Sequence, residues 1–251
     1  MINRKGQITI FVFVAVIIVS GILLVFLVSR TPRINVGQGF EPENFIDSCI
    51  REEVKEIVDG LLPQGGFVNP ADFKLYNDIK VSYLCKNINY YEPCVVQHTN
   101  FISVLEEEIR SNLQERTEEC FILLEDELDD RNYQHEGGEV EIEVALNTGQ
   151  IEMDIFRNFI LSRNGETREF SSFRILLISS LYDLGWIANE IASQEAKFCY
   201  FENAGFNALY NEFDVRKDVL SDSTKIYSIK NKKTQEEMNI AIRGCAIPAG
   251  F

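Results

Sequence analysis

The feature that most constrains this chain is an uninterrupted apolar stretch near its beginning. From Ile8 to Val28 the sequence reads ITIFVFVAVIIVSGILLVFLV, 21 residues without a charged side chain. At 1.5 Å per residue, a helix of this length matches the hydrocarbon core of a bilayer, which is about 30 Å thick. Its serine and threonine are tolerated because a hydroxyl can donate to a carbonyl one turn earlier. The sequence therefore predicts a transmembrane helix that contacts the lipid bilayer through residues 8–28.

A cleaved secretory signal is the alternative interpretation of this stretch. Such a signal has an apolar region of about 7–15 residues that ends in small residues. Here the run is longer, and Val28 is followed by the sequence SRT. A retained anchor is favoured, so residues 1–33 are expected to form a cytoplasmic head and a single membrane span. Arg4 and Lys5 precede the span, which favours a cytoplasmic N-terminus and an extracytoplasmic location for residues 34–251.

The remainder of the chain has the composition of a folded, acidic protein. Apolar side chains make up 45% of the sequence, which is enough to build a core and excludes a wholly disordered chain. Four of the 24 Lys and Arg residues lie in residues 1–33, which leaves 20 bases against 39 acids and a net charge of −19 for the rest. A surface with this charge repels phosphate backbones, so we expect no nucleic-acid partner.

All six cysteines lie beyond the apolar stretch. An even number of cysteines in an exported domain indicates disulfides rather than free thiols. The pairs favoured by position are Cys85 with Cys94 in a local loop, and Cys49 with Cys120 on two predicted helices, which leaves Cys199 with Cys245. A metal site is the alternative, because Cys85, Cys94 and His98 form a C-x8-C-x3-H run. No CxxC pair accompanies that run, so no metal ligands are predicted.

Hydrophobic periodicity predicts an α+β fold for the outer domain, with antiparallel strands and several helices. A short tether, TPRINVGQGFE, precedes an amphipathic helix over residues 42–60. A hairpin is expected over residues 73–85 with its turn at Asn77 and Asp78, and a second helix is expected to begin at Thr99 or Asn100.

The second half of this domain begins near residues 134–138, where the period changes and a subdivision is possible. Alternation after that point predicts an antiparallel meander with turns near residues 147–149 and 164–165. Helical spacing returns over residues 175–192, and its acidic residues argue against a second membrane span. A helix over residues 201–213 and a closing hairpin made of TKIYSIK and MNIAIR complete the prediction.

No pattern in the sequence carries a recognisable reaction. His98 and His135 are the only histidines, and neither belongs to a nucleophile motif, so no catalytic residue is named. Gly65 and Gly66 lack the surrounding pattern of a phosphate-binding loop, and residues 125–130, EDELDD, lack the spacing of a calcium loop. No cofactor is therefore expected. Five aromatic residues are candidates for a sugar-stacking surface, although core packing is the commoner use of such side chains: Tyr90, Tyr91, Phe198, Tyr200 and Phe201.

The N-terminal sequence RKGQITIFVFVAVIIV resembles the class III signal of archaeal type IV pilin-like proteins. This resemblance implies cleavage between Gly6 and Gln7 with retention of the apolar helix. Phe11 stands at the fifth mature position, where many pilins have glutamate. The FIDSC helix, the LLPQGGFV turn and the ending IAIRGCAIPAGF are similar to a group of uncharacterised archaeal single-pass membrane proteins, a similarity that implies no activity.

These observations predict a membrane-anchored cell-surface protein with a structural or interaction role, which acts by association and not by catalysis. Its partners would be copies of itself or other cell-surface proteins. A type IV pilin-like filament subunit processed after Gly6 is one alternative. An extracytoplasmic enzyme or ligand-binding protein is the other, and the sequence does not indicate its substrate.

Overall fold

The structure is a computed structural model in which residues 40–246 are described. Pro42 begins a compact unit that contains every helix and strand given below. The predicted membrane span at residues 8–28 and the predicted processing site at Gly6 and Gln7 lie outside the described residues. Among residues 40–246, no helix combines the length and the apolar character needed to cross a membrane.

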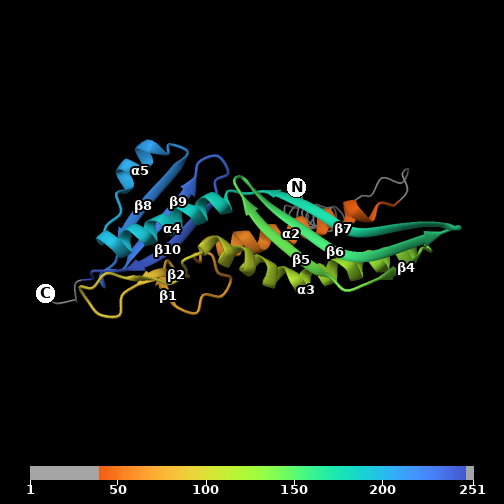
Figure 1. Cartoon of the computed structure of the whole chain (residues 1–251), viewed down its shortest axis with the longest axis horizontal. Helices are drawn as coiled ribbons and strands as arrows, with labels where there is room; N and C mark the ends of the chain where they lie inside the picture. Colours follow the sequence, from red (N-terminus) through yellow and green to blue (C-terminus); the bar gives the residue numbers. More distant parts are fainter. Residues whose placement is uncertain (1–39, 247–251) are drawn as a thin grey trace, which may run out of the picture. The chain divides into compact units, whose positions relative to one another are not determined.

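The described chain is a mixed α+β fold, as predicted, with two largely antiparallel sheets and three disulfides (Figure 1). Residues 134–138, where a subdivision is possible from the sequence, contain a strand that pairs with a neighbour in the meander. The helices are α2 (Pro42–Leu61), α3 (Phe101–Asp130), α4 (Leu181–Phe198) and α5 (Asn203–Leu209). The strands are β1 (Phe73–Tyr76), β2 (Ile79–Lys86), β3 (Val95–Val96), β4 (Gln134–Gly137), β5 (Glu141–Asn147), β6 (Gln150–Arg163), β7 (Glu166–Ile178), β8 (Phe213–Val219), β9 (Lys225–Asn231) and β10 (Glu237–Arg243).

Helices α2 and α3 pack against each other and against the meander. Helix α2 starts at Pro42, whose fixed backbone angle suits a first helical turn, and its apolar residues recur at helical spacing. Helix α3 starts after Asn100, as predicted, although the Asn100 amide donates to the Ser103 hydroxyl and does not cap a backbone N–H. The two helices are tied by the Cys49–Cys120 disulfide. Their buried residues include Ile46, Ile50, Val54, Leu105, Ile109, Leu113, Phe121 and Leu124.

The meander is the four-stranded sheet. Strand β6 pairs with β7 along one edge, while β5 and β4 pair with successive parts of the other edge. Alternate residues of β6 are buried, which matches the period of a strand with one face on the core. The turns at Gly149 and Gly165 both use positive φ angles, as the sequence predicts for tight hairpins. Phe121 of α3 lies edge-on to Phe173 of β7, and this contact joins the helices to the sheet.

The second sheet has the order β1-β2-β10-β9-β8, with β3 paired to β2. The predicted hairpin over residues 73–85 is confirmed, because Asn77 and Asp78 both have positive φ and link antiparallel β1 and β2. The predicted closing hairpin is also confirmed, as β9 and β10. The expectation of antiparallel strands fails in one place, since β10 runs parallel to β2.

Helix α4 packs against the second sheet and also reaches α3 and the meander. Its Gly185 allows a close approach, because a Cβ atom there would lie 2.6 Å from the Leu105 side chain. The α4 N-terminus is closed by Glu236, whose carboxylate accepts a hydrogen bond from the Ser180 backbone N–H at 2.6 Å and one from the Ser179 hydroxyl at 2.7 Å. The first contact satisfies the backbone N–H of the N-cap residue, which has no intrahelical partner.

Two predicted elements need correction. The helix expected over residues 175–192 begins at Leu181, because residues 175–178 continue strand β7 with Ile175 buried and Ile178 exposed. The helix expected over residues 201–213 is the shorter α5, and the chain then enters strand β8. Both errors arise from short apolar runs, whose periodicity does not separate a helix from a strand.

Candidate functional site

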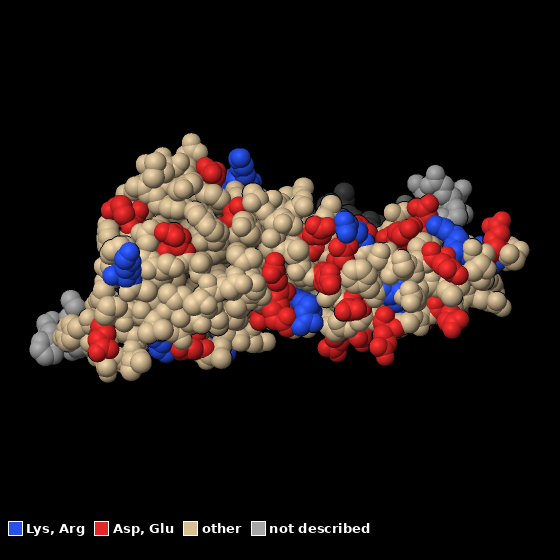
Figure 2. All heavy atoms as spheres, viewed as in Figure 1, with Lys and Arg blue, Asp and Glu red and all other residues tan. Residues whose placement is uncertain are grey.

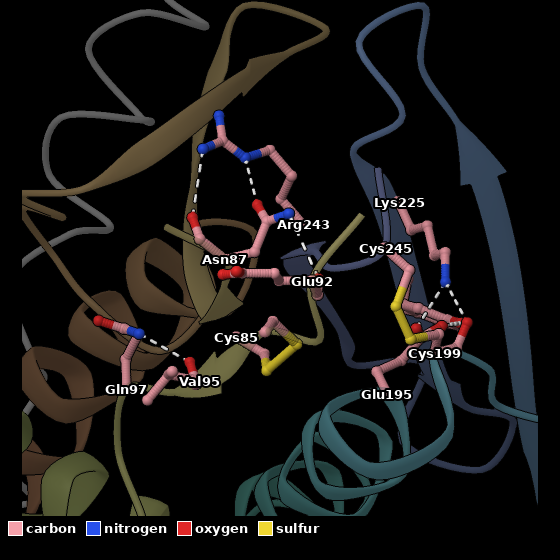
Figure 3. Close-up of a disulfide and its surroundings, with 12 residues drawn as sticks. Cys85, Asn87, Glu92, Val95, Gln97, Glu195, Cys199, Lys225, Arg243 and Cys245 are labelled. Carbon is pink, nitrogen blue, oxygen red and sulfur yellow. Dashed lines mark hydrogen bonds and ion pairs between the residues drawn. A yellow bond between two sulfur atoms is a disulfide. The ribbon is translucent and has the colours of Figure 1, made fainter. Parts of the chain in front are cut away.

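Two disulfides lie close to each other at one end of the second sheet, in the region drawn in Figure 3. Cys85 and Cys94 close a short loop after β2, and Cys199 at the end of α4 is joined to Cys245 after β10. With Cys49–Cys120, these are the pairs favoured from the sequence, and no cysteine is free. We call this region, residues 85–95 with Cys199 and residues 243–246, the braced end.

Hydrogen bonds hold the loop of the braced end against the last residues of β10. The buried Asn87 receives a hydrogen bond on its side-chain oxygen from Arg243 Nε at 2.9 Å and donates its backbone N–H to the Arg243 carbonyl at 2.7 Å (Figure 3). The Cys245 N–H donates to the Glu92 carbonyl, and the Tyr91 N–H donates to the Ala246 carbonyl. The loop is therefore fixed by backbone and side-chain contacts as well as by a disulfide.

The outer surface of this loop is apolar and aromatic. Ile88 is 85% exposed, and Tyr90, Tyr91 and Val95 are each at least half exposed. Arg243 lies over the Tyr90 ring at 6.0 Å. Aromatic side chains displayed on a rigid loop are suited to association, because little conformational entropy remains to be lost on binding.

The five aromatic residues considered for sugar stacking do not form one surface. Phe201 is 1% exposed and contacts Tyr227 in the core, so its role is packing. Phe198 and Tyr200 are exposed, and Lys217 Nζ lies over the Tyr200 ring, 4.7 Å from its centroid.

A buried polar cluster lies beneath the braced end. Glu195 of α4 is fully buried; its Oε2 atom lies 2.5 Å from Lys225 Nζ of β9, and its Oε1 atom accepts a hydrogen bond from the Tyr227 hydroxyl. Lys225 Nζ also donates to the Cys199 carbonyl at 2.8 Å. Burial and the neighbouring Glu195 carboxylate raise the pKa of Tyr227 far above its usual value. The phenol is therefore a hydrogen-bond donor at every physiological pH.

A groove of about 550 Å³ lies between α3 and the meander. It is lined by five carboxylates, in a part of the surface where acids gather (Figure 2). Several of these carboxylates already have partners, since Glu107 pairs with Arg110 and Asp154 pairs with Arg174. The lining residues are Ser103, Glu106, Glu107, Arg110, Ile142, Glu143, Val144, Ala145, Glu152 and Asp154.

The histidines are separated and have structural contacts. His98 packs against Phe67 at 5.2 Å between ring centroids, and burial lowers its pKa. His135 lies 3.2 Å from Asp129 and stacks on Phe159. The alternative metal site at Cys85, Cys94 and His98 has no free thiol to bind a metal ion, because Cys85 and Cys94 form a disulfide. Within residues 40–246, no group of three His, Cys, Asp or Glu residues is placed to hold a metal ion.

Two other sequence patterns have structural explanations. Gly65 and Gly66 form the turn after α2 with positive φ, and a Cβ atom on Gly66 would lie 2.6 Å from the Leu105 side chain. Residues 125–130 form the last turns of α3, where Leu128 is buried and Glu125 pairs with Arg157.

The cluster around Glu195 was missed by the sequence interpretation, although a signal for it exists. Glu195 follows Leu184, Ala188 and Ile191 on the buried stripe of α4. A carboxylate on such a stripe requires a buried partner, because an isolated buried charge is very costly.

Comparison with known proteins adds no relative: no family model matches the chain, and neither a curated protein nor a solved structure matches it.

Proposed function

We propose that this chain is a membrane-anchored cell-surface protein that acts by association with other proteins. The observation that carries the proposal is the set of three disulfides, which uses every cysteine of the chain. Disulfides persist in oxidising compartments outside the cytosol. The apolar residues 8–28 supply the anchor in this proposal.

The braced end is the proposed contact surface. In Figure 1 it lies at the opposite end of the compact unit from Pro42, where α2 begins. It combines exposed Tyr90 and Tyr91 with a loop held by the Cys85–Cys94 disulfide. The face shown in Figure 2 has its acids concentrated over the α3 and meander half, so contacts made by the other half involve less like-charge repulsion.

Location is tested with the full-length chain in intact cells. The expected result is that it sediments with membranes, that external protease digests the domain, and that its cysteines resist alkylation until a reductant is added. A chain that fractionates with the cytosol and reacts directly with the alkylating agent would refute the proposal.

Association is tested by chemical cross-linking of the membrane-bound chain. A Tyr90→Ser/Tyr91→Ser variant is expected to lose cross-linked products, while a Phe156→Ser variant on the exposed face of β6 serves as the control. Equal loss in both variants, or in neither, would contradict a role for the braced end.

The pilin-like alternative differs in how the N-terminus is processed. Peptide mapping that finds Gln7 as the first residue supports a processed filament subunit, in which the 8–28 helix would pack against copies of itself. An intact Met1 supports the permanent anchor.

A further inference from the structure

The buried cluster of Glu195, Lys225 and Tyr227 has no part in the proposed association. It joins the last turn of α4 to strand β9, and the Lys225 amine touches the Glu195 carboxyl group at 2.5 Å (Figure 3). The Glu195 side chain is 0% exposed and that of Lys225 is 16% exposed. A nucleophile and an acyl group are thus held in contact where little water reaches them.

The charged form of such a pair is costly. Removing an ammonium and a carboxylate from water carries a desolvation penalty that their mutual attraction repays only in part. Transfer of one proton from Lys225 to Glu195 gives a neutral amine beside a neutral carboxylic acid, without a change in net charge. Fixing two reacting groups in contact also supplies a large effective concentration, which lowers the barrier to reaction.

We propose that Lys225 and Glu195 form an intramolecular amide bond. The lone pair of Lys225 Nζ attacks Glu195 Cδ, and the bond between Cδ and Oε2 breaks. Oε2 leaves as water, which takes up one proton from the nitrogen and retains the proton of the carboxylic acid. No oxidant, reductant or other reactant is needed. The Tyr227 hydroxyl donates to Oε1, the atom that becomes negative in the tetrahedral intermediate, and so stabilises the transition state.

The surroundings fit the product as well as the reactants. An amide has one N–H donor and one carbonyl acceptor. The nitrogen already donates to the Cys199 carbonyl at 2.8 Å, and Oε1 already accepts from Tyr227. Both polar groups of the amide therefore keep the partners that they have now, and the atom that leaves is the one that contacts the nitrogen.

The chain contains a matched control for proximity alone. Lys74 Nζ and Asp222 Oδ2 are also 2.5 Å apart, but their side chains are 27% and 39% exposed. Both side chains are more accessible to water there than those of Glu195 and Lys225, and water stabilises the charged form of an ion pair. No amide is expected at that pair.

The test is mass spectrometry of the full-length chain after reduction and alkylation. The expected result is a linked product that joins residues 175–197 with residues 218–230 and is lighter than the two peptides by one water. Trypsin produces these peptides because it does not cleave after a lysine whose amine is in an amide. No linked product is expected from Lys74 and Asp222.

Two variants separate the chemistry from the fold. Lys225→Arg keeps a positive charge and is expected to lose the linked product completely, while disulfide mapping verifies the native fold. Tyr227→Phe is expected to form the link about 100-fold more slowly after refolding, since it lacks the donor to the developing oxyanion. Unlinked peptides alone from the folded wild-type chain would overturn the proposal, as would equal linkage at the control pair of Lys74 and Asp222.

Discussion

The Cys49–Cys120 disulfide is expected to contribute more to stability than the Cys85–Cys94 disulfide, because it closes a much longer loop. The two bonds span sequence separations of 71 and 9 residues. The chain-entropy relation for the unfolded state gives about 4.4 kcal/mol for the first separation and about 2.6 kcal/mol for the second. Replacement of both cysteines by alanine in each pair is therefore expected to lower the free energy of unfolding by these amounts.

Guanidinium denaturation of the two double variants, without reductant, measures this difference. Each variant loses two sulfur atoms from positions that are buried or partly buried, so the loss of packing is similar and the difference in loop entropy remains. The Cys49→Ala/Cys120→Ala variant is also expected to show the steeper dependence on denaturant, since its unfolded state is released from the larger loop and exposes more surface.

An equal or smaller loss of stability in the Cys49→Ala/Cys120→Ala variant would refute this reasoning. It would mean that the contact between α2 and α3 holds without the covalent link, or that the unfolded chain remains compact there. A wild-type protein with both disulfides intact is the reference for both measurements.

Three further changes test other parts of the fold. Burial lowers the pKa of His98 in the folded state. The stability that depends on the neutral imidazole is therefore fully present above pH 6.5 and is lost as the pH falls through the depressed folded pKa. Denaturation measured as a function of pH should show that a His98→Gln variant lacks this loss. Gly66→Ala should lower the free energy of unfolding by about 2–4 kcal/mol, because the position has a positive φ and the added Cβ atom would overlap side chains of α3. Gly149→Ala should lower it by about 1–2 kcal/mol, because that position also has a positive φ but has open space around it. Glu236→Ala removes the carboxylate at the α4 N-terminus and should cost about 1–2 kcal/mol by thermal unfolding. This is more than the cost of Glu237→Ala, because Glu237 pairs with the exposed Arg216.

Local patterns predicted the hairpins and the long helices well. The turns at Asn77 and Gly149 follow from residue types that tolerate positive φ, and α3 follows from buried residues at helical spacing. Strand β8 was missed because only Phe213 and Val215 of its sequence FDVRKDV are buried, so its charged residues obscure the alternation.

Apart from the disulfides Cys49–Cys120 and Cys199–Cys245, sequence patterns did not predict which distant segments lie in contact. The parallel pairing of β10 with β2 joins residues far apart in the chain, and no local signal specifies it. The same holds for Glu195 and Lys225, where the position of the glutamate on an apolar stripe indicates that a partner is required but not which one.

The position of β10 has a consequence for how the protein is made. This strand lies between β2 and β9 although it is synthesised after every other helix and strand that the structure describes. Until it arrives, β1–β2 and β8–β9 are separate hairpins, and isolated hairpins are marginally stable. A product truncated before Glu237 would leave the facing edges of β2 and β9 unpaired, open to proteases and to pairing with other chains. Synthesis through Arg243 is therefore required before β2 and β9 are joined in one sheet.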